Sequence, residues 1–218
     1  MGVLVDTTIL SRTIRIRSPH GMGSAVVFGD QSTRIVVTAA HLLRGTQAGD
    51  RVALRHGGDW HFITVEDIEF GVTDVCAIVP TTQWGEGLPL SMLDGQVMVG
   101  EDIAFCGYPL GLEMNAILNA NWPTPLVKSG IYSGSIDVAG QVHLLFDAAN
   151  NVGFSGGPIV RKNTKTNKLT VVGIVSGYKF DKPQPVIVTD ADGVETESPT
   201  HFVKPNSGFM YGVPAADA

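Results

Sequence analysis

Long apolar runs are absent from the sequence, and no stretch approaches the ~18 residues that a membrane-spanning helix needs. The opening stretch, Met-Gly-Val-Leu-Val-Asp, also lacks the basic start and the apolar core of a secretory signal. Asp6 stands where a myristoylation signal needs Ser or Thr. We therefore expect a cytoplasmic protein without membrane contact.

Cysteines and clustered basic residues are also scarce. Cys76 and Cys106 each lie in an apolar run, which favours buried free thiols over a disulfide. The formal net charge is −6, and the 15 Lys and Arg residues are spread along the chain, so nucleic-acid binding is not expected. The histidines form no His-Glu-x-x-His pair and the cysteines no Cys-x-x-Cys pair. The sequence therefore predicts no metal and no cofactor.

Short β-branched runs bounded by Gly, Pro or Asp make up most of the chain, with little helical periodicity. Residues 13–17 (Thr-Ile-Arg-Ile-Arg) alternate apolar and basic side chains, which predicts a half-buried strand. Two sets of about six such runs predict an all-β fold with two antiparallel β-barrels, over residues 1–90 and 91–218. Residues 179–206 are predicted to form an insertion with its own hairpin, turning at residues 190–193.

One serine lies in a glycine-rich stretch, residues 150–160 (Asn-Asn-Val-Gly-Phe-Ser-Gly-Gly-Pro-Ile-Val). A serine hydroxyl needs a base to become a nucleophile, and acyl transfer needs backbone N–H donors for the developing oxyanion. Glycines permit unusual backbone conformations and close approach of a substrate. We expect Ser155 to be the nucleophile and the N–H groups of Gly153 and Ser155 to form the oxyanion hole. Taken alone, the stretch is more typical of a glycine-rich turn between strands.

Two upstream residues complete a catalytic set. His41 follows a predicted strand at residues 34–38, and Asp74 opens the apolar run at residues 74–79. A carboxylate at the edge of such a run needs a polar partner. In this interpretation His41 takes the proton of Ser155 and returns it to the leaving amine, while Asp74 orients the imidazole. Each residue alone has a structural interpretation, but the three together favour catalysis.

Three segments resemble the signatures of trypsin-like serine proteases, most closely the HtrA-like branch. They are residues 37–41 (Val-Thr-Ala-Ala-His), 74–78 (Asp-Val-Cys-Ala-Ile) and 153–158 (Gly-Phe-Ser-Gly-Gly-Pro). The resemblance covers nearly all of the chain except residues 179–206. It implies a serine endopeptidase acting on polypeptides, built as two six-stranded barrels with the active site in the cleft between them. It covers a protease domain alone, without a PDZ domain, and leaves the oligomeric state open.

The resemblance also bears on activation and specificity. Phe154 stands where zymogen-activated secreted relatives carry an acid that pairs with a freed N-terminus, so activation by such cleavage is not expected. Ala149 stands where trypsin has an acid, so a small or medium apolar side chain is expected before the scissile bond, at the P1 position. The backbone of residues 175–177 is expected to pair with the substrate as an added strand. The implied substrate-binding residues are Ala149, Asn150, Asn151, Val152, Val175, Ser176 and Gly177.

Two other functions fit parts of the sequence. Residues 153–157 also match the Gly-x-Ser-x-Gly elbow of α/β-hydrolase esterases, with Asp190 or Asp192 and then His201 as partners. That elbow needs a helix directly after the serine, and Pro158 disfavours one. A protease fold that binds peptides without cutting them is the second alternative. For residues 179–206, a gate over the cleft, a partner-binding element and a plain surface hairpin all stay open.

Overall fold

The computed structural model describes residues 2–29, 33–56, 58–82, 87–94, 96–114, 123–164 and 166–217. The chain begins with a short helix, α1 (Thr7–Arg12), which is capped by the Asp6 carboxylate accepting from the N–H of Ile9 at 3.1 Å. Ile9 is fully buried and anchors the helix in an apolar cluster that also contains Val26 and Phe28. The sequence did not predict this helix, because a helix of six residues is too short to establish a periodic pattern.

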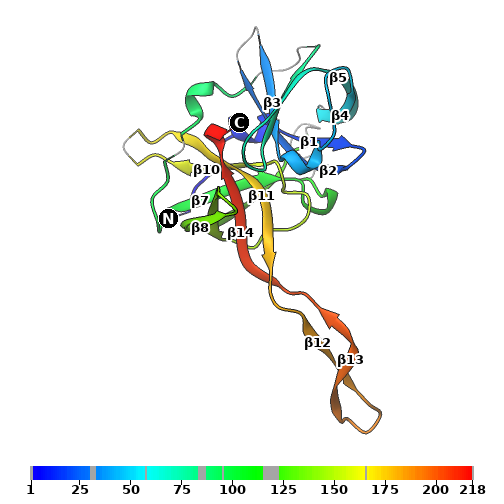
Figure 1. Cartoon of the computed structure of the whole chain (residues 1–218). Helices are drawn as coiled ribbons and strands as arrows, with labels where there is room; N and C mark the ends of the chain where they lie inside the picture. The colour runs from blue at the N-terminus through cyan, green and yellow to red at the C-terminus, as the bar shows by residue number, and fades with distance from the viewer. Residues whose placement is uncertain are drawn as a thin grey trace.

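The first half of the chain forms a closed antiparallel barrel with the strand order β1-β2-β3-β6-β5-β4 (Figure 1). Its interior is filled by β-branched and leucine side chains such as Ile14, Val36, Leu54 and Ile78. The strands are β1 (Thr13–Ser18), β2 (Gly21–Gly29), β3 (Arg34–Thr38), β4 (Arg51–His56), β5 (Asp59–Phe70) and β6 (Cys76–Pro80).

The second half forms another closed antiparallel barrel, in the order β10-β11-β14-β9-β8-β7. Phe105, Phe146 and Val172 are fully buried inside it. The strands are β7 (Asp102–Gly107), β8 (Leu126–Val138), β9 (Gln141–Asp147), β10 (Pro158–Lys162), β11 (Leu169–Phe180) and β14 (Asn206–Pro214). The predicted all-β double-barrel fold is confirmed.

A third apolar cluster joins the barrels, with Val26 and Phe28 of β2 packing in one core with Ala104 and Val160 of the second barrel. Three short 3-10 turns lie between described strands, η1 (Ala40–Leu42), η2 (Leu90–Met92) and η3 (Pro109–Gly111), and η5 (Ala215–Asp217) follows β14. None of the helices in the described ranges is long and apolar enough to cross a membrane.

The strand predicted at residues 13–17 is present as β1, but the prediction that it is half-buried is wrong. The first four residues of β1 are all buried, including Arg15, which is only 9% exposed. The guanidinium of Arg15 lies 3.6 Å from the carboxylate of Glu113, which belongs to the loop after β7. The basic side chain faces the other half of the molecule instead of water.

The predicted insertion forms two paired antiparallel strands, β12 (Gln184–Thr189) and β13 (Glu195–Val203), which we call the arm. Figure 1 shows that the arm projects beyond the ends of β11 and β14, away from both barrels. Its turn is closed by the N–H of Gly193 donating to the carbonyl of Asp190 at 3.1 Å, so the predicted hairpin is confirmed.

Both cysteines are buried free thiols, as predicted. Burial raises the pKa of Cys76 to about 12, with a further contribution from the charge of Asp74. Burial likewise raises the pKa of Cys106 to about 12. Neither thiol has the lowered pKa that a reactive cysteine needs.

Candidate active site

The imidazole of His41 and the carboxylate of Asp74 form a hydrogen-bonded pair. His41 lies in η1 just after β3, and Asp74 lies just before β6, which pairs with β3 at Thr38 and Cys76. Nδ1 of His41 lies 2.8 Å from Oδ2 of Asp74, and the backbone N–H of His41 donates to Oδ1 at 2.9 Å. These contacts fix the position of His41 and the orientation of its ring.

The Asp74 carboxylate accepts hydrogen bonds from residues of both barrels. Burial alone would raise its pKa, but hydrogen bonds from His41 and Ser176 more than offset that effect, and the pKa lies below its ordinary value. The hydroxyl of Ser176, on β11, donates to Oδ2 at 2.6 Å. The sequence assigned Ser176 only to the pocket wall, so its hydroxyl contact with the acid was missed.

Ser155 lies in the loop between β9 and β10, packed directly against the first barrel. Its carbonyl accepts from the N–H of Ser24 at 2.8 Å. Gly156 has φ +85°, and a Cβ there would overlap the carbonyl oxygen of Ser24. A Cβ at Gly23 would lie 2.7 Å from the carbonyl oxygen of Ser155. Glycine at both positions therefore lets the loop reach the neighbourhood of His41.

The three predicted catalytic residues meet through Ser176. The hydroxyl of Ser155 donates to the carbonyl of Ser176 at 3.2 Å, while the hydroxyl of Ser176 donates to Asp74. Among the hydrogen bonds of the described residues, none joins Ser155 directly to His41. The structure thus brings His41 and Asp74 into direct contact, whereas the hydroxyl of Ser155 contacts the carbonyl of Ser176.

The N–H of Gly153 faces away from the loop that supports it. The carbonyl of Val152 accepts from the N–H of Leu110 at 2.8 Å. In a trans peptide the carbonyl and the next N–H point in opposite directions, so the N–H of Gly153 is directed to the other side. Within the described ranges, neither Gly153 nor Ser155 uses its N–H in a hydrogen bond.

Asn150 connects the two predicted walls of the P1 pocket. Its side chain donates to the carbonyl of Gly177 at 3.0 Å and accepts from the N–H of Asn151 at 2.7 Å. The amide of Asn206 donates to the Asn150 carbonyl at 2.6 Å. Asn150 is 1% exposed, so these bonds set the spacing between residues 149–152 and residues 175–177.

The far end of β11 has one open edge. β10 pairs with β11 no further than Ile174, whereas β14 accompanies β11 as far as Phe180. Among the described strands, residues 176–180 therefore pair with β14 alone, and the carbonyl of Ser176 accepts from the hydroxyl of Ser155. An unpaired edge of this kind accepts an added strand.

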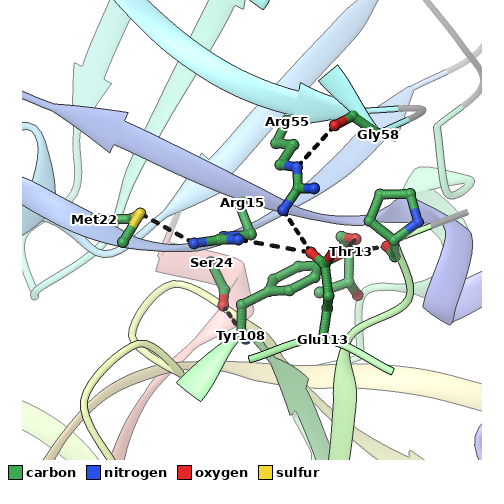
Figure 2. Close-up of polar contacts among 9 residues, drawn as sticks. Thr13, Arg15, Met22, Ser24, Arg55, Gly58, Tyr108 and Glu113 are labelled. Carbon is green, nitrogen blue, oxygen red and sulfur yellow. Dashed lines mark hydrogen bonds and ion pairs between the residues drawn. The ribbon is translucent and has the colours of Figure 1, made fainter. Parts of the chain in front are cut away.

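A polar cluster pins the loop after β7 to the first barrel (Figure 2). Ser24 accepts from the N–H of Tyr108 at 3.0 Å and donates to the carbonyl of Gly153 at 2.7 Å. The carboxylate of Glu113 accepts from the guanidinium of Arg55 at 2.6 Å and lies 3.6 Å from the guanidinium of Arg15.

The hydroxyl of Tyr108 also joins this cluster, since it lies 3.0 Å from the carbonyl of Thr13 and 2.8 Å from the carbonyl of Pro123. This cluster supports the segment that includes Leu110.

Residues 23–174 match the family model of the trypsin-like peptidase domain, which is more than half of the chain. The chain belongs to the trypsin-like peptidase family. The resemblance seen in the three sequence signatures is thereby confirmed, and the protein is a relative of serine proteases. No curated protein sequence matches this trypsin-like peptidase.

Solved protease structures share the fold at low sequence identity. Rv3671c from M. tuberculosis H37Rv, in an inactive serine-to-alanine form, matches with 16% identity and a TM-score of 0.59 over 100% of this chain and 92% of its own. The HtrA-type protease AlgW with a tripeptide matches with 16% identity and a TM-score of 0.61 over 96% of this chain. The match spans 58% of the AlgW chain. The MamO protease domain from Magnetospirillum magneticum matches with 16% identity and a TM-score of 0.57, over 96% and 95% of the two chains.

Proposed function

We propose that this trypsin-like peptidase is a serine endopeptidase with His41 as general base, Asp74 as orienting acid and Ser155 as nucleophile. The N-terminal barrel, residues 1–90, supplies the base and the acid, and the C-terminal barrel, residues 91–218, supplies the nucleophile. The 2.8 Å contact between Nδ1 of His41 and Oδ2 of Asp74 carries this proposal. That contact leaves Nε2, the other ring nitrogen, to exchange protons with Ser155.

Substrate binding completes the catalytic geometry in this proposal. An extended polypeptide adds to the open edge of β11 and donates a backbone N–H to the carbonyl of Ser176, which Ser155 occupies in the free protein. The hydroxyl of Ser155 then turns to Nε2 of His41. The proton moves to His41 as the Oγ–C bond forms, and the N–H groups of Gly153 and Ser155 receive the oxyanion.

The intermediate collapses when the C–N bond breaks and His41 returns the proton to the leaving amine. Water then attacks the acyl-enzyme with His41 again as base, which releases the acid product and restores Ser155. The lowered pKa of Asp74 supports this role, because an ionised carboxylate stabilises the imidazolium that forms in both steps. No metal or cofactor enters the proposed reaction.

A small or medium apolar P1 side chain fits this site best. Ala149, at the expected base of the pocket, carries no charge to receive Lys or Arg. Asn150 holds the two walls together through its bond to the Gly177 carbonyl. We assign the P1 pocket to Ala149, Asn150, Asn151, Val152, Val175, Ser176 and Gly177.

A peptide-library cleavage profile tests the proposal. We expect wild-type protein to cleave after small apolar residues and Ser155→Ala to leave every peptide intact. The second candidate is a module that binds peptides without cutting them, favoured by the lack of a direct bond between His41 and Ser155 among the described residues. Peptides that bind wild type and Ser155→Ala equally, with no cleavage by either, would establish that module and reject the endopeptidase.

A further inference from the structure

One lysine outside the proposed catalytic set contacts three parts of the loop before Ser155. Lys128 lies on β8, and its ammonium donates to the carbonyl of Ala149 at 2.8 Å and to Oδ1 of Asn151 at 2.7 Å. The same nitrogen lies 5.6 Å from the centroid of the Phe154 ring. All three contacted groups are electron-rich, so a single cation satisfies them together.

The contacted residues close around the peptide that is proposed to form the oxyanion hole. The N–H of Phe154 donates back to the carbonyl of Asn151 at 3.3 Å, which makes residues 151–154 a turn. Phe154 is fully buried and packs edge-on against Phe105, with ring centroids 4.9 Å apart. The Val152–Gly153 peptide lies inside this turn. Its direction depends on the bonds from Leu110 to the Val152 carbonyl and from Ser24 to the Gly153 carbonyl, and on how well the flanking residues Asn151 and Phe154 are fixed.

We propose that Lys128 is a positioning residue that holds residues 149–154 in the shape that presents the N–H of Gly153 to the substrate. This inference rests on the proposed endopeptidase function. Phe154 cannot pair with a freed N-terminal ammonium, so the loop needs order from within the chain. Lys128 supplies an ammonium that is present without any cleavage, and it binds the loop by two charge-assisted hydrogen bonds and one ring contact.

Loss of this contact should affect the transition state more than substrate binding. The oxyanion donors act on charge that develops during acyl transfer, so a loop that samples other shapes lowers kcat. Within the described ranges, Lys128 has no hydrogen bond to the open edge of β11, where the substrate backbone is proposed to pair, so KM is expected to change little. Removal of a complete oxyanion donor costs roughly 10²–10³ in kcat. A loosened donor should cost about tenfold or more by the same reasoning.

Lys128→Met and Lys128→Arg test the proposal. Methionine keeps the length of the stem but removes the cation and its N–H donors, whereas arginine keeps both. Lys162→Met, at an exposed lysine on β10, is the matched control. We expect kcat to fall about tenfold or more in Lys128→Met with KM within about twofold, to recover in Lys128→Arg, and to stay unchanged in Lys162→Met. An unchanged kcat in Lys128→Met, or a rise in KM alone, would overturn the proposal.

Hydrogen exchange supplies a readout that does not depend on cleavage. We expect faster exchange in Lys128→Met confined to peptides that cover residues 149–157, and wild-type exchange in Lys162→Met. Asn151→Ala in the Lys128→Met background should add little, because the two side chains share one contact. If wild-type protein is unable to cleave peptides, the proposed function fails. Faster exchange in Lys128→Met would still support the inference that Lys128 orders residues 149–154. Unchanged exchange in Lys128→Met would reject it.

Discussion

The hydroxyl of Ser176 provides a quantitative test of how Asp74 is held. Ser176→Ala removes one of the three donors to the carboxylate and leaves the two from His41 in place. Hydrogen bonds to charged groups contribute roughly 1.5–3 kcal/mol. Because the Asp74 side chain is 23% exposed, water replaces part of the lost bond. We therefore expect a loss of about 1–2 kcal/mol in the free energy of unfolding at neutral pH.

The pH dependence of that loss has a defined sign. The pKa of Asp74 in the folded protein lies below its ordinary value of 3.8. The carboxylate therefore stabilises the fold above that value, and this stabilisation is lost as the pH falls through the folded pKa. Ser176→Ala should raise the pKa of Asp74 in the folded protein, because the hydrogen bond from Ser176 lowers it. The ionised Asp74 then stabilises the variant less than it stabilises wild type, and this stabilisation is lost at a higher pH. The difference between the two proteins should shrink below pH 3.8.

Urea unfolding at several pH values measures both effects, provided that the slope of the transition is unchanged. Ser207→Ala is a suitable control, since its hydroxyl makes an exposed hydrogen bond to the uncharged carbonyl of Lys179 at 2.9 Å. That variant should lose less stability, with no dependence on acid pH. Equal stability of Ser176→Ala and wild type at every pH would refute the inference that Ser176 stabilises the charge of Asp74.

Three further predictions follow from the same structure. Asp74→Asn should lower kcat severely, on the order of 10⁴-fold, while Asp67→Asn should be near neutral in steady-state kinetics; the reverse result would mean that the acid is misassigned. Replacement of residues 182–204 by Asn-Gly should leave the melting temperature within a few degrees of wild type. The N–H of Asp181 already donates to the carbonyl of Pro205 at 2.8 Å, and the arm projects from the barrels. A large fall in the melting temperature would contradict this. Maleimide should label Cys76 slowly in native protein and rapidly in urea, because the thiol is buried with its pKa raised to about 12; rapid native labelling would show that this core opens.

The sequence predicted the barrels and the arm because their signals are local. Alternating and β-branched runs identified the strands, and the turn residues at 190–193 located the hairpin. The candidate residues His41, Asp74 and Ser155 were proposed from three short segments read together. These features depend on a few adjacent residues, so they are readable without a structure.

Features that depend on distant partners were not predicted. Arg15 is buried because Glu113 faces it from the other barrel, and nothing near Arg15 in the sequence indicates this. Lys128 occupies an ordinary strand position, and its contacts with Ala149 and Asn151 arise only when β8 and the serine loop meet. The bond between the hydroxyl of Ser176 and the acid has the same origin.

Reaction of the protein with a fluorophosphonate, followed by intact-mass analysis and peptide mapping, tests the central proposal most directly. An activated serine next to a histidine base forms one stable phosphonyl adduct, because the reagent mimics the tetrahedral intermediate. We expect one adduct on Ser155 in wild type, none in Ser155→Ala and a severely reduced rate in His41→Ala. A wild-type protein that stays unmodified, or an adduct on another residue that persists in Ser155→Ala, would contradict the assignment.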